Sequence, residues 1–348
     1  KIPKEKVVPV LSKATRILTK KIIKMQLVLD TKGIKMTKKN DTFYIASDKY
    51  ERNISPTKLS SIAVTTNVQI DTSAVLLAIK NQIPILFLDH YGRVKGRLWS
   101  PHFEGLSSLR RKQLRFTEST HASAFMVDLF QLKSSEQIEN LRRLQGHKFG
   151  FGTTITQAIK NIKSQTRNFE RFRDQLPEHC RQNMMGTEGT IAHMYWQAFG
   201  NGLPRKYSFQ KRSRRPAEDA FNCLINYAYG MLYGIVESAI FSVGLDPYIG
   251  ILHTDIYAKP TLAFDLIEPF RPWIDRLLAE ACLEQLIDNK FFTSNQHGIT
   301  LNKEGKAFLI PKFNDLMRTP KKWLNREASV NNQIYFLAGQ LASKIRGS

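Results

Sequence analysis

The sequence predicts an α+β protein, in which a small, mainly β domain at residues 25–103 precedes a larger all-α domain at residues 104–348. Two observations support this prediction. Short apolar runs separated by Gly, Asn and Asp turn signals fill the first part, whereas apolar stripes with helical spacing fill the second. The length of 348 residues and the 42% hydrophobic content allow each part to bury its own core.

Residues 1–24 carry eight Lys or Arg residues and one acid, Glu5. Two interpretations are open for this segment. It is either a solvated basic leader or a linker from a preceding domain. A regular strand pattern begins only at Met25.

The β domain is expected to contain short strands, and the pairs Lys32-Gly33 and Asn40-Asp41 mark hairpin turns. Asp71 is a good N-cap for a helix over residues 72–81. The apolar run at residues 83–89 indicates a buried strand. The predicted strands cover residues 25–31, 33–37, 41–47, 58–65, 83–89 and 93–100.

The second domain is expected to be helical, with one β-hairpin at residues 291–310 lying over it. A helix at residues 218–244 is almost entirely apolar, which predicts that it is buried. The remaining predicted helices cover residues 107–120, 121–145, 153–176, a segment that starts near Gly186, 261–286 and 312–345.

The charge balance restricts the partners of this protein. Lys and Arg outnumber Asp and Glu by 52 to 30, a net charge of +22, which favours nucleic acid or another polyanion as a partner. The segment between Pro204 and Pro216 is the most basic, and we expect it to be a loop that contacts phosphates. Its candidate contact residues are Arg205, Lys211, Arg212, Arg214 and Arg215.

Several function classes are disfavoured by the sequence. It contains no Walker A motif, dinucleotide-binding glycine fingerprint, GxSxG elbow or HExxH motif. No apolar run is long enough to span a bilayer, and there is no signal-peptide pattern. Three scattered cysteines form no CxxC pair, which fits a reducing cytoplasm.

The stretch from Gly250 to Pro272 is the strongest candidate for chemistry. His253 directly follows the apolar run from Ile249 to Leu252, and a helix is expected to start near Thr261. On that helix Asp265 and Glu268 are three residues apart, so both carboxylates should project from one face. A cation should offset their repulsion, either a hard divalent ion such as Mg²⁺ or Mn²⁺, or Arg271 on the same face. The alternative is an ordinary helix with a packed histidine and a Glu–Arg pair.

A second acidic candidate is Glu188, which lies between Gly186 and Gly189 at an expected helix start. These glycines would allow the backbone to approach closely around the carboxylate. A carboxylate in the first turn of a helix is also favoured by the helix dipole alone, so Glu188 has a purely structural explanation as well.

Five stretches resemble the CRISPR adaptation integrase family, in the order expected for that family and along nearly the whole chain from Met25. They are MQLVLDTKG, IPILFLDHYGRVKGRL, MGTEGTIAHMYWQAF, RRPAEDAFNCLINYAYGMLYGIVESAIFSVGLDPYIGILH and TLAFDLIEPFRP. The resemblance implies a β-sandwich-like N-terminal domain and an α-helical catalytic domain. It also implies one Mg²⁺ or Mn²⁺ site built from Glu188, His253 and Glu268, with Asp265 beside the ligands. Many members have Asp where this chain has Glu268.

The resemblance implies that a spacer 3′-hydroxyl attacks a phosphodiester of the repeat, with Lys259 and Arg271 as candidate phosphate contacts. Arg271 has an equal alternative role, a structural pairing with Glu268. The implied partners are double-stranded spacer and repeat DNA, a small companion adaptation protein, and a second copy of this chain. Two homodimers would form the full complex, in a prokaryotic cytoplasm and without a membrane. Some relatives are fused behind a reverse transcriptase, which would suit the basic linker interpretation of residues 1–24.

Two other functions fit the same residues. A metal-dependent nuclease acting on branched DNA in repair would use the same ligands on a different substrate. A non-catalytic basic scaffold for nucleic acid would need none of the carboxylates, so their substitution would leave it intact. A strand-transfer assay with a free 3′-hydroxyl separates the integrase from both alternatives.

Overall fold

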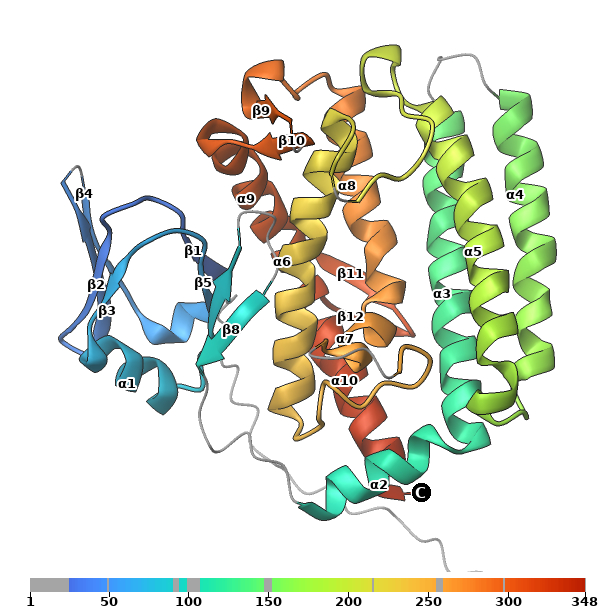
Figure 1. The fold of residues 1–348 in the computed structure, drawn as a ribbon, viewed down its shortest axis with the longest axis horizontal. Helices are drawn as coiled ribbons and strands as arrows, with labels where there is room; N and C mark the ends of the chain where they lie inside the picture. Colours follow the sequence, from blue (N-terminus) through green and yellow to red (C-terminus); the bar gives the residue numbers. More distant parts are fainter. Residues whose placement is uncertain are drawn as a thin grey trace, which may run out of the picture.

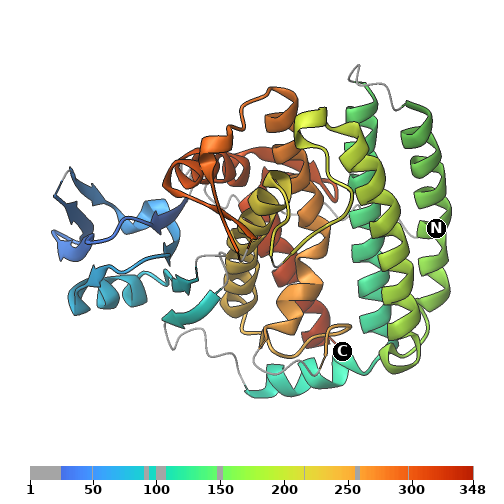
Figure 2. The same cartoon turned by 45° about the horizontal axis from the view of Figure 1, so that its top comes forward.

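The computed structural model describes residues 25–48, 50–89, 94–98, 107–146, 152–214, 216–254, 259–296 and 298–347. A small β domain lies to one side of a larger helical domain, as Figure 1 and the turned view in Figure 2 both show. The strands of the β domain lie within residues 25–98, and the helical domain begins by residue 107. The α+β fold class is therefore confirmed, while the proposed boundary at residues 103–104 lies outside the described residues.

The β domain contains two four-stranded sheets that share one core. The first sheet has the strand order β1 (Met25–Leu29), β5 (Leu59–Val64), β7 (Ile85–Leu88), β8 (Val94–Leu98). The second has the order β4 (Tyr50–Ile54), β3 (Thr42–Ser47), β2 (Lys35–Lys39), β6 (Gln69–Ile70). Leu29 and Ile62 of the first sheet and Met36 and Phe43 of the second belong to one buried cluster. Alternate residues of both sheets supply this core, as expected for two facing sheets.

The turn signals in the β domain have different outcomes. Asn40 and Asp41 have φ of 49° and 54° and connect β2 to β3 in an antiparallel pair, as predicted. The pair Lys32-Gly33 forms no hairpin, because β1 pairs with β5 in one sheet and β2 pairs with β3 in the other. Asp71 caps helix α1 (Thr72–Lys80) by accepting a 2.6 Å hydrogen bond from the Ser73 amide, as predicted.

The second domain is mainly helical, and α6 (Ala220–Ser242) lies at its centre with almost every residue buried (Figure 1). Three helices, α3, α4 and α5, pack side by side along the part of the domain farthest from the β domain. The other helices are α2 (Ser107–Thr117), α3 (Thr120–Gln145), α4 (Gly152–Arg167), α5 (Pro177–Gly202), α7 (Thr261–Leu266), α8 (Arg271–Leu283), α9 (Lys303–Arg318) and α10 (Val330–Gly347). No helix in the described residues is both long and apolar enough to cross a membrane.

The C-terminal part departs from the prediction in two places. Strands β9 (Phe292–Asn295) and β10 (Gly298–Leu301) form the expected hairpin, but residues 303–310 belong to helix α9. A second hairpin, β11 (Pro320–Trp323) with β12 (Arg326–Ser329), interrupts the helix expected over residues 312–345. Its turn residues Leu324 and Asn325 both have positive φ, at 48° and 59°. The helical domain is thus not purely α.

One buried ion pair connects the two domains. Arg97 on β8 lies 3.1 Å from Glu237 on α6, with Nη2 facing Oε2, and their side chains are 4% and 6% exposed. The guanidinium also lies over the ring of Phe241, 4.5 Å from its centroid. Burial lowers the pKa of Arg97 and raises the pKa of Glu237, because each charge is removed from water.

Candidate active site

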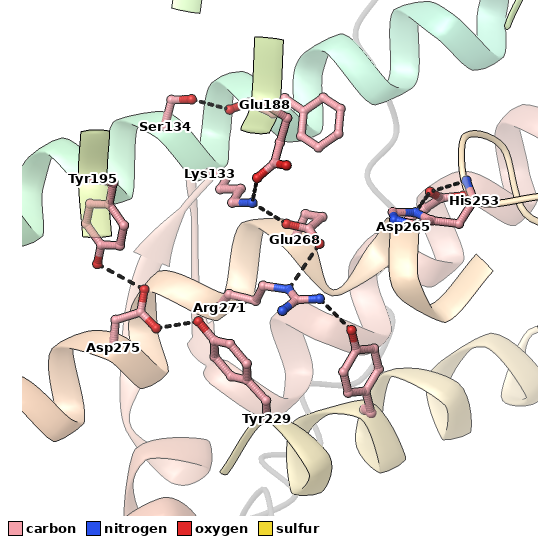
Figure 3. Close-up of polar contacts among 12 residues, drawn as sticks. Lys133, Ser134, Glu188, Tyr195, Tyr229, His253, Asp265, Glu268, Arg271 and Asp275 are labelled. Atoms are coloured by element: carbon pink, nitrogen blue, oxygen red, sulfur yellow. Dashed lines mark hydrogen bonds and ion pairs between the residues drawn. The ribbon is translucent and has the colours of Figure 1, made fainter. Parts of the chain in front are cut away.

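Glu188 lies in the middle of helix α5, not at a helix start. The helix begins at Pro177, eleven residues earlier in the chain, so the expectation of a helix opening near Gly186 was wrong. An added Cβ at Gly186 or Gly189 would meet nothing within 4 Å, so no close backbone approach requires these glycines. Glu188 points from α5 toward the neighbouring helix α3, where its carboxylate reaches Lys133 while the side chain remains 27% exposed (Figure 3).

His253 is held in place by Asp265. The Asp265 carboxylate accepts hydrogen bonds from the amides of Ile251, Leu252 and His253, at 2.6, 3.3 and 3.3 Å. His253 Nδ1 lies 2.7 Å from Asp265 Oδ1 and donates to it, since an ionised carboxylate only accepts. The opposite ring nitrogen, Nε2, is then an acceptor that is suited to ligate a metal.

Gly250 allows the tight turn that leads into His253. An added Cβ at this position would lie 2.2 Å from the His253 carbonyl oxygen and 2.8 Å from Thr261 Cβ. No side chain fits at such distances, so the turn requires glycine. The turn and Asp265 together fix both the backbone and the ring of His253.

The sequence predicted that Asp265 and Glu268 project from one face of a single helix. In the structure they do not. Helix α7 ends at Leu266, a 3₁₀ turn spans Glu268–Phe270, and α8 starts at Arg271. Pro269 and Pro272 lack the amide hydrogens that a continuous helix would need here. The two buried carboxylates therefore diverge, because Asp265 binds the His253 turn whereas Glu268 turns toward α3.

A lysine that the sequence interpretation missed lies between the two glutamates. The ammonium of Lys133 on α3 forms ion pairs with Glu188 Oε1 and Glu268 Oε2 (Figure 3). Its side chain is only 10% exposed, so these pairs form largely out of water. The signal was present in the sequence, because Lys133 falls at helical spacing on the apolar stripe that includes Phe130 and Leu141.

Arg271 supports Glu268 from the other side. Arg271 Nε lies 3.0 Å from Glu268 Oε1, and the guanidinium donates to the hydroxyl of Tyr233. It also lies over the ring of Tyr229, 4.9 Å from the centroid. This geometry favours the structural pairing over the phosphate contact for Arg271.

These contacts shift the titration of the site. Burial opposes the charged form of Lys133, but the charges of Glu188 and Glu268 outweigh it and raise the Lys133 pKa. Burial also opposes ionisation of Glu268, but Arg271 and Lys133 outweigh it and hold the Glu268 pKa below its usual range. For His253 the hydrogen bond and charge of Asp265 outweigh burial and raise the pKa.

A further buried carboxylate, Asp275 on α8, is linked to the site through Tyr229. It accepts hydrogen bonds from the hydroxyls of Tyr195 at 2.9 Å and Tyr229 at 2.5 Å. Burial raises the pKa of Asp275 to about 6. Tyr229 therefore touches both Asp275 and Arg271, and this links the packing of α5, α6 and α8 to the position of Glu268.

The donor set fits a hard divalent cation, although the ligands are not preassembled. Glu188 and Glu268 already converge on one positive charge, and His253 offers a correctly oriented ring nitrogen. Across the described residues, no three His, Cys, Asp or Glu side chains lie close enough together to hold a metal ion. Lys133 occupies the position between the carboxylates. A metal would thus have to take the place of an ammonium.

The basic loop does not present all its charges outward. The guanidinium of Arg212 lies over the rings of Trp196 and Tyr229, at 5.2 and 5.9 Å, and donates to Asn222 and Asn226. Arg212 therefore packs the loop against α5 and α6. The exposed members of the candidate phosphate-contact set are Arg205, Lys211, Arg214 and, from the other stretch, Lys259. Arg215 lies outside the described residues.

Comparison with known proteins identifies what this arrangement resembles. The family model described as CRISPR associated protein Cas1 matches residues 27–315. A curated relative, CRISPR-associated endonuclease Cas1 1 of Archaeoglobus fulgidus, is 24% identical over 335 residues, which cover 93% of this chain and 97% of the relative.

Two solved structures share the fold. A casposase bound to an integration product has a TM-score of 0.77 at 21% identity, over 92% of this chain and 90% of the other. A chain of a Cas6-RT-Cas1–Cas2 complex has a TM-score of 0.74 at 22% identity, and the match covers 93% of this chain and 35% of that one.

Proposed function

Because this chain belongs to the Cas1 family, an endonuclease family that acts in CRISPR spacer acquisition, we propose that it is a metal-dependent integrase of spacer DNA. The observation that carries the proposal is the convergence of Glu188 and Glu268 on one buried cation, beside a histidine that Asp265 orients. These side chains come from three separate segments of the chain, and two carboxylates that converge on one buried position repel each other unless a cation offsets their charge.

The proposed site holds Mg²⁺ or Mn²⁺ through Glu188, Glu268 and Nε2 of His253. Such an ion, when bound, polarises a phosphoryl oxygen and favours the deprotonated form of an attacking hydroxyl. Arg271 fixes the carboxylate of Glu268, and Asp265 keeps the ring of His253 in the ligating tautomer.

The proposed reaction is a transesterification. The spacer 3′-oxygen forms a bond to phosphorus, the bond from that phosphorus to the 3′-oxygen of the repeat breaks, and the proton of the attacking hydroxyl passes to the leaving oxygen through solvent. No covalent enzyme intermediate is needed. The role of the protein is to hold the two DNA ends in line and to offset phosphate charge, for which its surplus of +22 is suited.

The proposed partners are double-stranded spacer and repeat DNA, a second copy of this chain and a small companion protein. Insertion of a duplex joins two ends, so two sites must be held at a fixed distance, and two-fold symmetry is the commonest way to do this. The likeness to the Cas6-RT-Cas1–Cas2 complex supports Cas2 as the companion. It also supports the proposal that this chain is the integrase part of a reverse-transcriptase fusion.

An integration assay with a labelled 3′-hydroxyl spacer and a repeat plasmid tests the function. We expect joined product with Mg²⁺ or Mn²⁺, its loss with a chelator, and at least a hundredfold loss in Glu188→Gln, His253→Ala and Glu268→Gln. DNA affinity should stay within a few fold, since most of it comes from phosphate contacts elsewhere.

The same variants separate the alternatives. Activity within about tenfold of wild type in any one variant would remove that residue from the proposed metal site. Cleavage of branched DNA without strand transfer would favour the repair nuclease. DNA bridging that survives all three substitutions, with no joining by the wild type, would favour the scaffold.

A further inference from the structure

We propose that Lys133 is a displaceable counterion, which holds Glu188 and Glu268 together in the metal-free protein and moves to Gln137 when a divalent cation binds. This inference rests on the proposed function, because it concerns the same site. It adds a residue that neither the sequence motifs nor the metal chemistry requires.

The charges of the site explain why Lys133 must give way. In the metal-free protein, the two glutamates are balanced by the ammonium of Lys133 and the guanidinium of Arg271. The Asp265 carboxylate beside His253 adds a third negative charge, so with a neutral imidazole the site carries one net negative charge before any metal arrives. A divalent cation added to it would leave one uncompensated positive charge in a largely buried place, which is unfavourable, whereas departure of one ammonium would leave the site neutral. Arg271 is held by Tyr229 and Tyr233, so Lys133 is the cation that is free to leave.

The structure also offers a destination for the displaced ammonium. Gln137 follows Lys133 by one helical turn on α3, so the two side chains share a face. The side-chain oxygen Oε1 of Gln137 is buried and has no hydrogen-bond partner among the described residues. Both residues line one small void, together with Ser134 and Glu188.

An unpaired buried acceptor costs free energy, because it has lost the hydrogen bonds that water gives it in the unfolded chain. Other buried side chains among the described residues also have an unpaired polar atom, but of these only Gln137 lines the small void that Lys133 and Glu188 share. The Gln137 oxygen gains a strong donor if the ammonium of Lys133 rotates toward it after leaving the carboxylates. The unpaired acceptor in the metal-free protein is thus explained as the second of two positions for one ammonium.

Mn²⁺ binding to the full chain without DNA tests the proposal, with free Mn²⁺ measured by electron paramagnetic resonance. Lys133→Met should bind Mn²⁺ more tightly than wild type by roughly tenfold or more, because the metal no longer competes with an ammonium. The unfolding midpoint of Lys133→Met without metal should be lower than that of wild type. Addition of Mn²⁺ should raise the midpoint of this variant by more than it raises that of wild type. Gln137→Leu as a single substitution should weaken Mn²⁺ binding by several fold. Added to Lys133→Met, the same substitution should leave Mn²⁺ binding unchanged.

Lys160→Met is the matched control, since it removes one positive charge from an exposed position on α4 and should leave Mn²⁺ binding within about twofold. If Lys133→Met does not fold, Lys133→Gln serves for the same measurement. Unchanged or weaker Mn²⁺ binding in the Lys133 variant would overturn the proposal. Wild-type Mn²⁺ affinity in Gln137→Leu would overturn the role of Gln137. Failure of the proposed function has a different signature, because wild type would then show no Mn²⁺ site sensitive to Glu188→Gln.

Discussion

Arg212 and Arg214 lie two residues apart in the basic loop, yet the structure predicts different roles for them. The Arg212 guanidinium packs on Trp196 and Tyr229 and donates to Asn222 and Asn226, whereas Arg214 is exposed. Arg212→Ala should therefore act on stability, and Arg214→Ala should act on DNA binding.

The expected size of the Arg212 effect follows from its contacts. Hydrogen bonds to a charged group contribute about 1.5–3 kcal/mol each, and a cation–π contact about 0.5–2 kcal/mol. When Arg212 is removed, the Asn222 side-chain oxygen still accepts a 3.1 Å hydrogen bond from the Ser213 amide, so the loss of the hydrogen bond from Arg212 is partly compensated. We expect a net loss of about 3 kcal/mol in the free energy of unfolding, and a midpoint lowered by roughly 5–10 °C.

The assay pairs thermal unfolding with a salt titration of DNA affinity. Arg214→Ala should keep the unfolding midpoint and flatten the plot of log affinity against log salt by roughly one unit if it contacts one phosphate. Arg212→Ala, measured below its unfolding temperature, should keep the wild-type slope. If Arg212→Ala is as stable as wild type and its salt dependence is flattened, Arg212 contacts DNA and does not stabilise the fold. That result would refute the reasoning.

Three further predictions concern the site and the assembly. Since burial raises the pKa of Asp275 to about 6 from an ordinary 3.8, the folded state holds this proton more tightly than the unfolded chain, and stability should fall as pH rises from about 4 to 6. In urea unfolding, wild type should lose about 2 kcal/mol of stability over that range relative to Asp275→Asn, and parallel pH profiles of the two proteins would contradict the prediction. Gly250→Ala should displace His253 and abolish integration at unchanged DNA affinity, while Gly186→Ala, which meets nothing within 4 Å, should keep full activity in the same assay. Light scattering should show a homodimer of the 40.0 kDa chain, and a monomer at micromolar concentration that still joins both spacer ends would exclude it.

The sequence predicted best where one physical pattern dominated. The apolar segment over residues 218–244 became the buried helix α6, and the Asp71 cap and the Asn40-Asp41 turn were confirmed. The hairpin β11–β12 was missed because its turn uses Leu324 and Asn325 at positive φ, where Asn-Gly would have been a recognisable signal.

At the site, the sequence identified the acidic residues but not their geometry. The interpretation of Asp265 and Glu268 as one face assumed an unbroken helix, although Pro269 breaks it. The position of Lys133 on the apolar stripe of α3 could have indicated that this side chain is buried, but it could not indicate Glu188 as the partner. That pairing depends on how α3 and α5 pack, which no local pattern encodes.

The ion pair between Arg97 and Glu237 has a consequence for exchanging domains between relatives. Glu237 lies one helical turn beyond Tyr233, the residue whose hydroxyl meets Arg271, so α6 carries both the domain contact and the wall of the site. A chimaera that receives a β domain without an arginine at this position would bury the Glu237 carboxylate unpaired, at a cost of about 3–5 kcal/mol. Grafts should therefore transfer β8 and α6 as a matched pair, and a chimaera that takes only one of them should recover if Glu237 is replaced by a neutral residue such as Gln.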